Sequence, residues 1–213
     1  MSVSITGIIH TGRDKFHKYF ADGGKINVDF KDGALFHCGP VVVKNDGEWK
    51  VVAAGPTTSV RENPYEPKFI ADSGVRIIIG KGGMDKATLE AMRKYGCVYI
   101  QAVGGAAAVS AASVKRVQGV DFLDEFGAAE ACWHFEVEGF RGVVAMDANG
   151  TSLFERIESL SREKYINIVT LAVKNNLAVT FHAGLDVGLP EVVHCTPERA
   201  YRMLERVIAN TQG

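Results

Sequence analysis

Residues 75–102 read VRIIIGKGGMDKATLEAMRKYGCVYIQA, and this stretch decides the fold. Two apolar runs, at 76–79 and 97–102, flank an amphipathic segment at 85–95, which is the pattern of a strand, a helix and a second strand. Asp85 is suited to begin the helix and Gly96 to end it. Because one helix joins two short, almost wholly apolar strands, we expect the strands to be parallel and covered on both faces. The stretch predicts a βαβ unit.

The chain on either side continues the alternation of apolar runs and amphipathic segments, so it predicts an α/β fold with mixed sheets. The expected strands are 5–9, 34–37, 117–122, 132–137, 142–146 and a hairpin at 41–54, and the expected helices are 13–20, 67–73 and 106–112. From residue 155 the pattern becomes a long helical run at 155–175, an apolar run at 177–181 and a final helix from about 197. We therefore predict a catalytic domain at 1–154 and a C-terminal helical extension at 155–213, packed on the same domain.

Composition narrows the class of protein. The chain has 213 residues, 46% of them hydrophobic and 23% charged, as in globular proteins of one or two domains. Its net charge of −1, from 24 basic and 25 acidic side chains, gives no electrostatic footprint for a nucleic acid. No run approaches the roughly 18 apolar residues of a membrane span, and no signal peptide is evident. These features predict a cytoplasmic protein with no nucleic-acid or membrane partner.

The four cysteines are scattered along the chain at positions 38, 97, 132 and 195. They form no CxxC pair, and no histidine lies at a zinc-ligand spacing from them. We interpret them as ordinary buried thiols and predict no metal bound by this chain.

Four glycine-containing segments stand out because each follows an apolar strand. They are HTGRD at 10–14, FHCGP at 36–40, AGPTTSVR at 54–61 and IGKGGM at 79–84. Ligands of open α/β sheets bind at the carboxyl ends of the strands, where loops present polar groups on a rigid frame. The four segments are therefore expected to converge on one pocket.

The segment at 54–61 is the most informative of the four. Gly55-Pro56 forces a turn, and Thr57, Thr58 and the following serine then place three hydroxyl groups in succession, which suits an anion. Arg61 follows four residues after Thr57, and its guanidinium can hold a carboxylate through two hydrogen bonds. An ordinary loop with capping hydroxyls and a solvated arginine is an equally good reading of this segment alone.

Lys81 lies between glycines at the end of an apolar strand, which places its ammonium at the edge of the sheet. The segment is not a phosphate-binding P-loop, because Gly83 and Met84 stand near the lysine where that motif needs Ser or Thr. A nucleotide-binding protein is thus a minor alternative, and it predicts ATP binding that Lys81→Ala abolishes. A turn with an exposed lysine is the plainer reading of GKGG alone. An Arg13-Asp14 pair that opens a helix is likewise an ordinary surface feature when taken alone.

Taken together and in this order, the segments resemble a known family. Arg13-Asp14 with His17, the GP at 39–40, the GPTTSVR at 55–61, the GKGG at 80–83 and the GGAA at 104–107 are similar to the motifs of the β subunit or C-terminal domain of class I iron–sulfur fumarate hydratase. The β subunit of L-tartrate dehydratase shares them. The resemblance covers about residues 4–154 and implies a layered, swivelling β/β/α domain with mixed sheets.

The resemblance implies reversible hydration of a C=C double bond, with fumarate to malate as the leading reaction and tartrate to oxaloacetate as the alternative. A dicarboxylate needs a cation at each end, and the implied substrate-binding cations are Arg13, Arg61 and Lys81. A non-catalytic dicarboxylate-binding module, which kept the clamp without the chemistry, is a further alternative.

Two residues are implied to be catalytic, Thr57 and His17. In the family the threonine hydroxyl matching Thr57 contacts the substrate and is implicated in proton transfer at carbon, and Thr58 belongs to the same hydroxyl-rich binding loop. A threonine hydroxyl is a poor base unaided, so a neighbouring group has to activate it. His17 matches a position proposed as catalytic in the tartrate enzymes, although a histidine on a short helix is more often structural.

The family's Lewis acid is a [4Fe-4S] cluster held by three cysteines of the α subunit. The resemblance here is to the β part alone, and the scattered cysteines supply no such cage. We therefore expect a cluster-bearing α subunit as partner, an oligomeric assembly, and little or no activity without that partner.

Two departures from the family pattern have consequences. Glu62 stands where a methionine commonly follows the motif arginine, and we expect its negative charge to lie beside Arg61 and to weaken binding of a second carboxylate. Family members also carry a further Gly-Asp segment before the Arg-Asp motif. Only about a dozen residues precede the motif here, so we expect the N-terminal strand to be short or supplied by the partner.

Overall fold

The computed structural model describes residues 1–174, 179–182 and 192–195. The chain divides into two compact units, Met1–Phe154 and Glu155–Gly213. The first unit contains every residue predicted for the site. The described part of the chain holds no helix long and apolar enough to cross a membrane.

A mixed six-stranded sheet forms the centre of the first unit, in the order β1-β2-β5-β6-β8-β7. Its strands are β1 (Ser2–Thr11), β2 (Ala34–Phe36), β5 (Ile77–Gly80), β6 (Val98–Gln101), β7 (Val114–Asp121) and β8 (Cys132–Met146). The pairs β1–β2, β2–β5 and β5–β6 are parallel, whereas β8 runs antiparallel to β6, β7 and β1. Since β8 pairs with both β6 and β1, the pairings close a circuit of five strands. The predicted α/β content with mixed sheets is confirmed.

The predicted βαβ unit is present as β5, α3 (Lys86–Tyr95) and β6, with β5 and β6 parallel. The carboxylate of Asp85 accepts a hydrogen bond from the backbone N–H of Thr88 over 2.9 Å, which satisfies one of the free donors at the helix start. Gly96 ends the helix with a φ of 72°, a conformation that glycine adopts at little cost. The predicted cap and stop are thus both confirmed.

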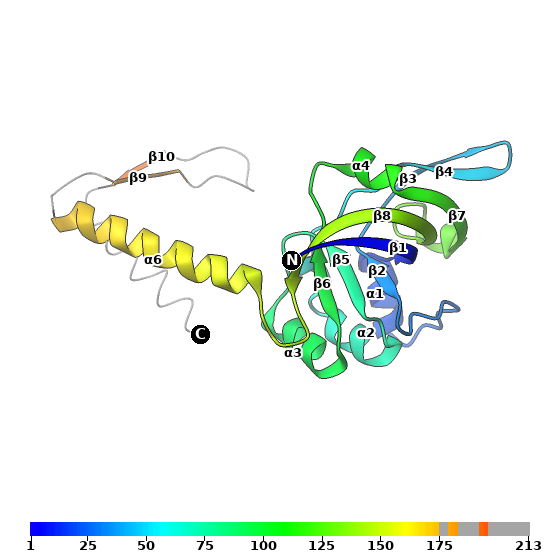
Figure 1. Cartoon of the computed structure of the whole chain (residues 1–213), viewed down its shortest axis with the longest axis horizontal. Coiled ribbons are helices and arrows are strands. Elements are labelled where there is room, and N and C mark those ends of the chain that lie inside the picture. The colour runs from blue at the N-terminus through cyan, green and yellow to red at the C-terminus, as the bar shows by residue number, and fades with distance from the viewer. Residues whose placement is uncertain (175–178, 183–191, 196–213) are drawn as a thin grey trace. The chain divides into compact units, whose positions relative to one another are not determined.

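The sheet buries a hydrophobic cluster on each face. Helices α1 (Asp14–Ala21), α2 (Glu66–Ser73) and α3 cover one face, as Figure 1 shows below the strands. Leu35, Ile78 and Tyr99, from three neighbouring strands, are completely buried against these helices. The alternate strand residues, including Phe36 and Ile79, are buried on the opposite face. This alternation explains why the central strands read as continuous apolar runs.

The second face is covered by the hairpin of β3 (Val41–Asn45) and β4 (Glu48–Ala53) together with α4 (Ala107–Ala112). The hairpin confirms the prediction for 41–54, and Trp49 on it packs edge-to-face on Trp133 of β8. Two short helical turns, η1 (Ser59–Glu62) and α5 (Leu123–Phe126), complete the unit.

Two strand predictions are corrected. The separate strands expected at 132–137 and 142–146 are one strand, β8, because a bend at Gly139, with φ 69°, leaves the chain paired with β1 on both sides of it. The N-terminal strand expected to be short is ten residues long, since β1 pairs with β8 along nearly its whole length.

The second unit holds α6, which begins at Leu153 and ends at Lys174, and a two-stranded antiparallel sheet of β9 (Val179–His182) and β10 (Val192–Cys195). The long helix predicted at 155–175 is confirmed. The final helix predicted from about residue 197 lies outside the described residues.

Candidate active site

The hydroxyl segment that includes Thr57 lies between two other predicted loops. The backbone N–H of Thr57 donates to the carbonyl of His37 over 2.6 Å, and the N–H of Lys81 donates to the carbonyl of Thr57 over 3.3 Å. The N–H of Ser59 in turn donates to the carbonyl of Lys81 over 2.9 Å. These bonds continue the backbone hydrogen bonding of the sheet beyond the ends of β2 and β5. The loops 36–40, 54–61 and 79–84 therefore meet.

Arg13 joins the same group of loops from the start of α1. A side chain at Gly39 would overlap the guanidinium of Arg13, so the GP segment leaves room for that cation. Nη1 of Arg13 donates to the carbonyl of Ala129 over 3.2 Å and lies 3.4 Å from a carboxylate oxygen of Glu130. Its Nε is buried without a hydrogen-bond partner. One donor of Arg13 is thus left unused.

Arg61 is paired within the chain. Its Nε donates to Oδ1 of Asp14 over 3.1 Å, and its Nη2 meets Oδ2 of the same carboxylate. The sequence had left Asp14 without a role. Asp14 instead occupies the fork of guanidinium donors that a carboxylate ligand would use.

The GKGG segment owes its glycines to close packing. A side chain at Gly80 would overlap Oγ of Ser59, and one at Gly83 would overlap the ring of Phe154. Lys81 between them is half-buried, and within the described residues it forms no ion pair. The glycines hold the turn close to the sheet, which leaves the ammonium of Lys81 as a cation available to a ligand.

The hydroxyl-bearing residues of the segment differ in exposure. Thr57 is half-buried, Thr58 is exposed and Ser59 is completely buried. A ligand can therefore reach the first two hydroxyls, whereas the third belongs to the interior of the unit.

A buried polar network lies behind this segment, and the sequence predicted only one of its members, His17. Oε2 of Glu66 is 3.1 Å from Nε2 of His17 and 3.1 Å from Nε2 of His37. Nδ1 of His37 shares a hydrogen bond of 2.9 Å with Oγ of Ser59, which shares another of 2.9 Å with the hydroxyl of Tyr99. His17, His37, Glu66 and Ser59 are completely buried, so their polar atoms depend on one another.

The pKa values of the network follow from burial and from opposite charges. Burial alone would raise the pKa of Glu66, but the two neighbouring imidazoles outweigh it and lower the pKa to about 2. Burial alone would lower the pKa of His17, but the carboxylates of Glu66 and Glu62 raise it above its usual value. For His37, burial wins over Glu66 and lowers the pKa. The network thus favours the cationic form of His17 and the neutral form of His37.

Glu62 corrects one part of an expectation. Its side chain is completely buried rather than open to a ligand, and one carboxyl oxygen lies 3.4 Å from Nδ1 of His17. Burial raises the pKa of Glu62, with the charges of His17 and Arg61 opposing the shift in part. Glu62 therefore interacts with Arg61, as expected, but its carboxyl group also belongs to the interior network around His17.

The missed members had unequal signals in the sequence. His37 directly follows an apolar strand, as Lys81 does, so the same reasoning about strand ends applies to it. Glu66 opens a helix, where an acidic residue is common, and Tyr99 lies inside an apolar strand. Neither position carries a local sign of a polar partner.

The described thiols do not suit an iron–sulfur cluster. Cys38 is buried in one hydrophobic cluster and Cys97 and Cys132 in the other, on opposite faces of the sheet. Burial raises the pKa of all three thiols, that of Cys97 to about 12, whereas cluster ligation needs thiolates. These side chains form no cage and are held in their protonated form.

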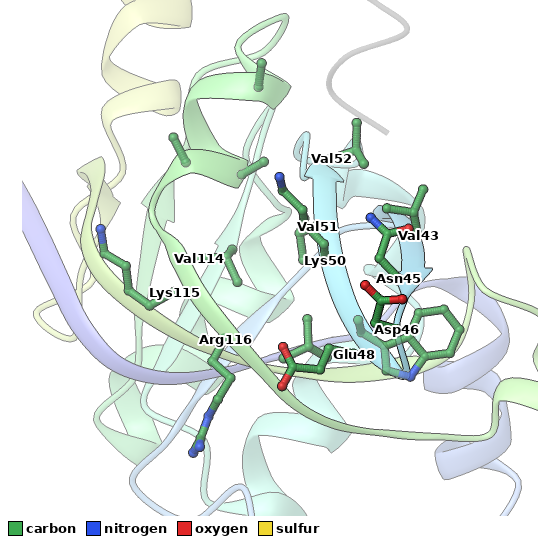
Figure 2. Close-up of a pocket in the computed structure, with 15 residues that line it drawn as sticks. Val43, Asn45, Asp46, Glu48, Lys50, Val51, Val52, Val114, Lys115 and Arg116 are labelled. Carbon is green, nitrogen blue, oxygen red and sulfur yellow. The ribbon is translucent and has the colours of Figure 1, made fainter.

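A separate hollow of about 1050 Å³ lies between the β3–β4 hairpin and the segment formed by α4 and β7. Figure 2 shows Lys50 and Val51 of the hairpin facing Val114 of β7 across it. None of the site residues predicted from the sequence lines this hollow. Its walls mix valines and alanines with charges of both signs, and no convergent set of polar groups marks it as the reacting centre.

Comparisons with known proteins show the family of the chain. A family model described as "Fumarase C-terminus" matches residues 1–157. A Geobacillus stearothermophilus protein assigned as a class I fumarate hydratase is 50% identical over 163 residues, which cover 76% of this chain and 31% of that protein. The chain thus spans less than a third of that relative.

Two further relatives match over most of their own length. A Methanocaldococcus jannaschii protein assigned as an L(+)-tartrate dehydratase β subunit is 40% identical over 174 residues, covering 79% of this chain and 89% of the relative. The L(+)-tartrate dehydratase subunit beta of Escherichia coli is 33% identical over 169 residues, covering 78% and 84%.

Proposed function

The chain belongs to the fumarase C-terminus family, and from that premise we propose that it is the β subunit of an iron–sulfur-dependent hydro-lyase that interconverts fumarate and malate. The observation that carries the proposal is the backbone ladder that joins Thr57 to Lys81, with Arg13 brought to the same loops beside Gly39. It assembles a hydroxyl and two cations from three separate strand ends.

Arg13, Arg61 and Lys81 bind the two carboxylates of the substrate in this proposal. Lys81 forms no ion pair within the described residues, whereas Arg13 must share its guanidinium with Glu130 and Arg61 its fork with Asp14. Holding both ends of a dicarboxylate fixes its rotation and brings the reacting carbon to the hydroxyl segment. Thr58, which is exposed, adds a hydroxyl donor to the same loop.

Thr57 moves the proton at the substrate carbon. Its hydroxyl needs a neighbouring positive charge to favour the alkoxide, and Lys81 is the cation whose backbone is bonded to that of Thr57. His17, predicted as catalytic, is completely buried against Glu66 and Arg13, so its contribution in this proposal is made through other residues.

The cluster is proposed to lie on an α subunit, where it supplies the Lewis acid for the leaving or attacking hydroxyl. The environment of the described cysteines supports that assignment, and so do two relatives that are named as β subunits. An oligomeric assembly, a cytoplasmic location, a layered swivelling β/β/α arrangement for residues 1–154 and a packed extension at 155–213 complete the proposal.

Reconstitution tests the function directly. The full chain is mixed anaerobically with a cluster-bearing α subunit, and the absorbance of fumarate and of the keto product formed from tartrate is followed. We expect hydration of fumarate in the mixture and none with either subunit alone. Absence of turnover with both substrates, while the cluster stays intact, would contradict the proposal.

L-tartrate dehydration is the second candidate reaction, because two relatives matched over 84% or more of their length carry that name. The ratio of kcat/KM for tartrate to that for fumarate in the same mixture decides between them. Thr57→Ala separates an enzyme from a dicarboxylate-binding module that lacks the chemistry. A large fall in kcat with binding retained supports the enzyme, and unchanged turnover excludes Thr57 from the reaction.

A further inference from the structure

The groups that face the two ring nitrogens of His17 define its protonation. Nδ1 lies 2.9 Å from the backbone carbonyl of Arg13, which can only accept, so Nδ1 carries a hydrogen. Nε2 lies 3.1 Å from Oε2 of Glu66, which is an ion-pair distance outside hydrogen-bond geometry, and the charge of the carboxylate favours a hydrogen on Nε2 as well. His17 is therefore a buried cation, paired with Glu66.

The partners of His37 define a different state. Its Nε2 faces the same carboxylate oxygen at 3.1 Å and so carries a hydrogen, whereas its Nδ1 faces the hydroxyl of Ser59 at 2.9 Å. With His37 neutral, Nδ1 accepts from Ser59, and the freed lone pairs of Ser59 accept from the hydroxyl of Tyr99, 2.9 Å away. Each group thus donates its hydrogen to the next in one direction: Tyr99 to Ser59, Ser59 to His37, and His37 to Glu66.

This chain of contacts ends on the loop that binds substrate in the proposed function. His37 holds the loop at two points, since its carbonyl accepts from the N–H of Thr57 and its ring accepts from Ser59. Ser59 in turn donates its N–H to the carbonyl of Lys81. The other tautomer of His37 would turn Nδ1 into a donor, so Ser59 would lose its acceptor on the ring and would have to donate to Tyr99 instead.

We propose that His37, oriented by the Glu66 carboxylate that it shares with His17, is a positioning residue that fixes the segment Thr57–Ser59 and thereby the placement of Thr57. The inference rests on the proposed function for its catalytic consequence. Its structural part, the fixed tautomer and the held loop, stands on contacts within this chain alone.

Two other uses of these residues fit the geometry less well. Ser59, His37 and Glu66 follow the order of a hydrolytic triad, but the Ser59 hydroxyl is completely buried and engaged by Tyr99, so no substrate reaches it. His17, His37 and Glu66 bring ligand atoms within 4.8 Å of one another, as a metal site would. A metal ion would have to displace the proton on Nε2 of His17 and enter a site with no exposed member.

Protonation can be measured on the full chain without any partner. The groups that face the two imidazoles are Glu66 from α2, Glu62 from η1 and the carbonyl of Arg13. Imidazole ¹⁵N shifts at neutral pH should show His17 doubly protonated and His37 protonated at Nε2 only. Two identical neutral rings, or one tightly bound metal ion per chain that both rings ligate, would overturn the inference.

Two isosteric changes at His37 separate positioning from simple packing. In His37→Asn the amide oxygen can take the place of Nδ1 and still accept from Ser59, whereas in His37→Gln the amide reaches the position of Nε2 and leaves Ser59 without an acceptor. We expect amide exchange of Thr57 to speed up about tenfold in His37→Gln, equivalent to about 1.4 kcal/mol of local stability. His37→Asn should speed it up less, and Ser59→Ala should match His37→Gln.

Matched controls account for general destabilisation. Thr88→Val removes another buried hydroxyl, which bonds to Asp85, and His134→Gln removes another histidine paired with an acidic residue, Asp121. Neither should alter the exchange of the Thr57 amide. Equal exchange in all variants would overturn the proposed positioning.

The catalytic consequence is read in the reconstituted complex. There, His37→Gln should lower kcat more than it raises KM, with His37→Asn closer to the native chain. If the native complex turns over neither fumarate nor tartrate, the proposed function fails, while the shifts and the amide exchange still decide the role of His37. If His37→Gln speeds up amide exchange of Thr57 but leaves kcat unchanged, the proposed effect of His37 on catalysis through Thr57 is wrong.

Discussion

Arg61 and Asp14 form a two-point ion pair between the hydroxyl segment and the start of α1. The pair is open to solvent, with 49% of the arginine side chain and 32% of the aspartate side chain exposed. Exposed pairs contribute little to stability. In the proposed clamp, Asp14 would keep Arg61 in place and its carboxylate would also compete with a substrate carboxylate for the same guanidinium.

Asp14→Asn tests this competition. The amide retains one acceptor oxygen for Arg61 and removes the negative charge, so a substrate carboxylate meets less repulsion. We expect KM for the dicarboxylate to fall about two- to fivefold, as the loss of a contact worth up to about 1 kcal/mol would give. Steady-state kinetics of the reconstituted complex measure it. A raised KM would mean instead that the full charge of Asp14 is needed to hold Arg61 for the substrate.

Lys81→Met removes a cation of the proposed clamp that has no ion-pair partner among the described residues. Because Lys81 holds the loop through its backbone bonds to Thr57 and Ser59, the fold should survive the change. We expect dicarboxylate affinity to fall about 10- to 100-fold, as for the loss of a charged hydrogen bond of about 1.5–3 kcal/mol. Lys115→Met, at a lysine that pairs with Glu138 at the surface, is the control. Unchanged affinity in Lys81→Met would exclude the clamp role.

His17 and His37 together predict that the free energy of unfolding is greatest near pH 6.5, which is the ordinary pKa of a histidine. The pKa of His17 is raised on folding, so its contribution is complete below 6.5 and is lost as pH rises through the raised pKa. The pKa of His37 is lowered, so its contribution is present above 6.5 and is lost as pH falls through the lowered pKa. Glu62, whose pKa burial raises above 4.5, loses its contribution as pH rises.

Urea midpoints measured from about pH 5 to about pH 8 check this, a range in which carboxylate and imidazole linkage commonly sets stability. His17→Gln should flatten the alkaline side of the profile, and His37→Gln the acid side. Thr88→Val, which removes a buried hydroxyl and no titrating group, serves as the control and should leave the shape unchanged. Burial and His134 lower the pKa of His10 to about 4, so His10 contributes to the acid side in every variant. Slopes identical to those of the native chain in both the His17 and the His37 variant would contradict the assignment of the two protonation states.

Gly80→Ala addresses the contact between the GKGG turn and the network. The added methyl group would overlap Oγ of Ser59 and lie 3.0 Å from the Tyr99 hydroxyl and 3.2 Å from Nδ1 of His37. We expect a loss of about 1–3 kcal/mol in the free energy of unfolding, as for overpacking elsewhere. Gly104→Ala is the matched control, because its methyl group would make only an ordinary contact of 3.7 Å with Lys81. Equal stabilities of the two variants would argue against tight packing at Gly80.

Local patterns predicted the elements that depend on local chemistry. The β5–α3–β6 unit, the Asp85 cap, the Gly96 stop and the β3–β4 hairpin are each specified by residues within a few positions. β8 was misread because its continuity depends on partners more than 100 residues away in β1, which pair with it on both sides of the bend at Gly139. A glycine at a bend resembles a turn when the pairing strand is unknown.

The residues of the candidate site also fall into those that local sequence predicts and those that it does not. Loops that follow apolar strands could be identified from the sequence, and those of Thr57, Lys81 and Arg13 do lie together. The buried partners Glu66 and Tyr99 could not, since each looks ordinary in its own helix or strand and gains a polar neighbour only when the strands are paired. The burial of Glu62 also depends on tertiary packing, because η1 turns its carboxyl group towards His17.

The pairing of β1 with β8 sets the order of events during synthesis. Ser2 pairs with Val143, and the strand up to Ile9 finds its described partners only in β8. The ribosome must therefore release residues 132–146 before the first strand is seated, although the loop bearing Thr57 has long emerged. Contacts so distant in sequence are slow to form. A nascent chain that stalls before residue 132 thus presents the loop bearing Thr57 on an unclosed sheet, and under the proposed function substrate binding would report completed synthesis of the unit.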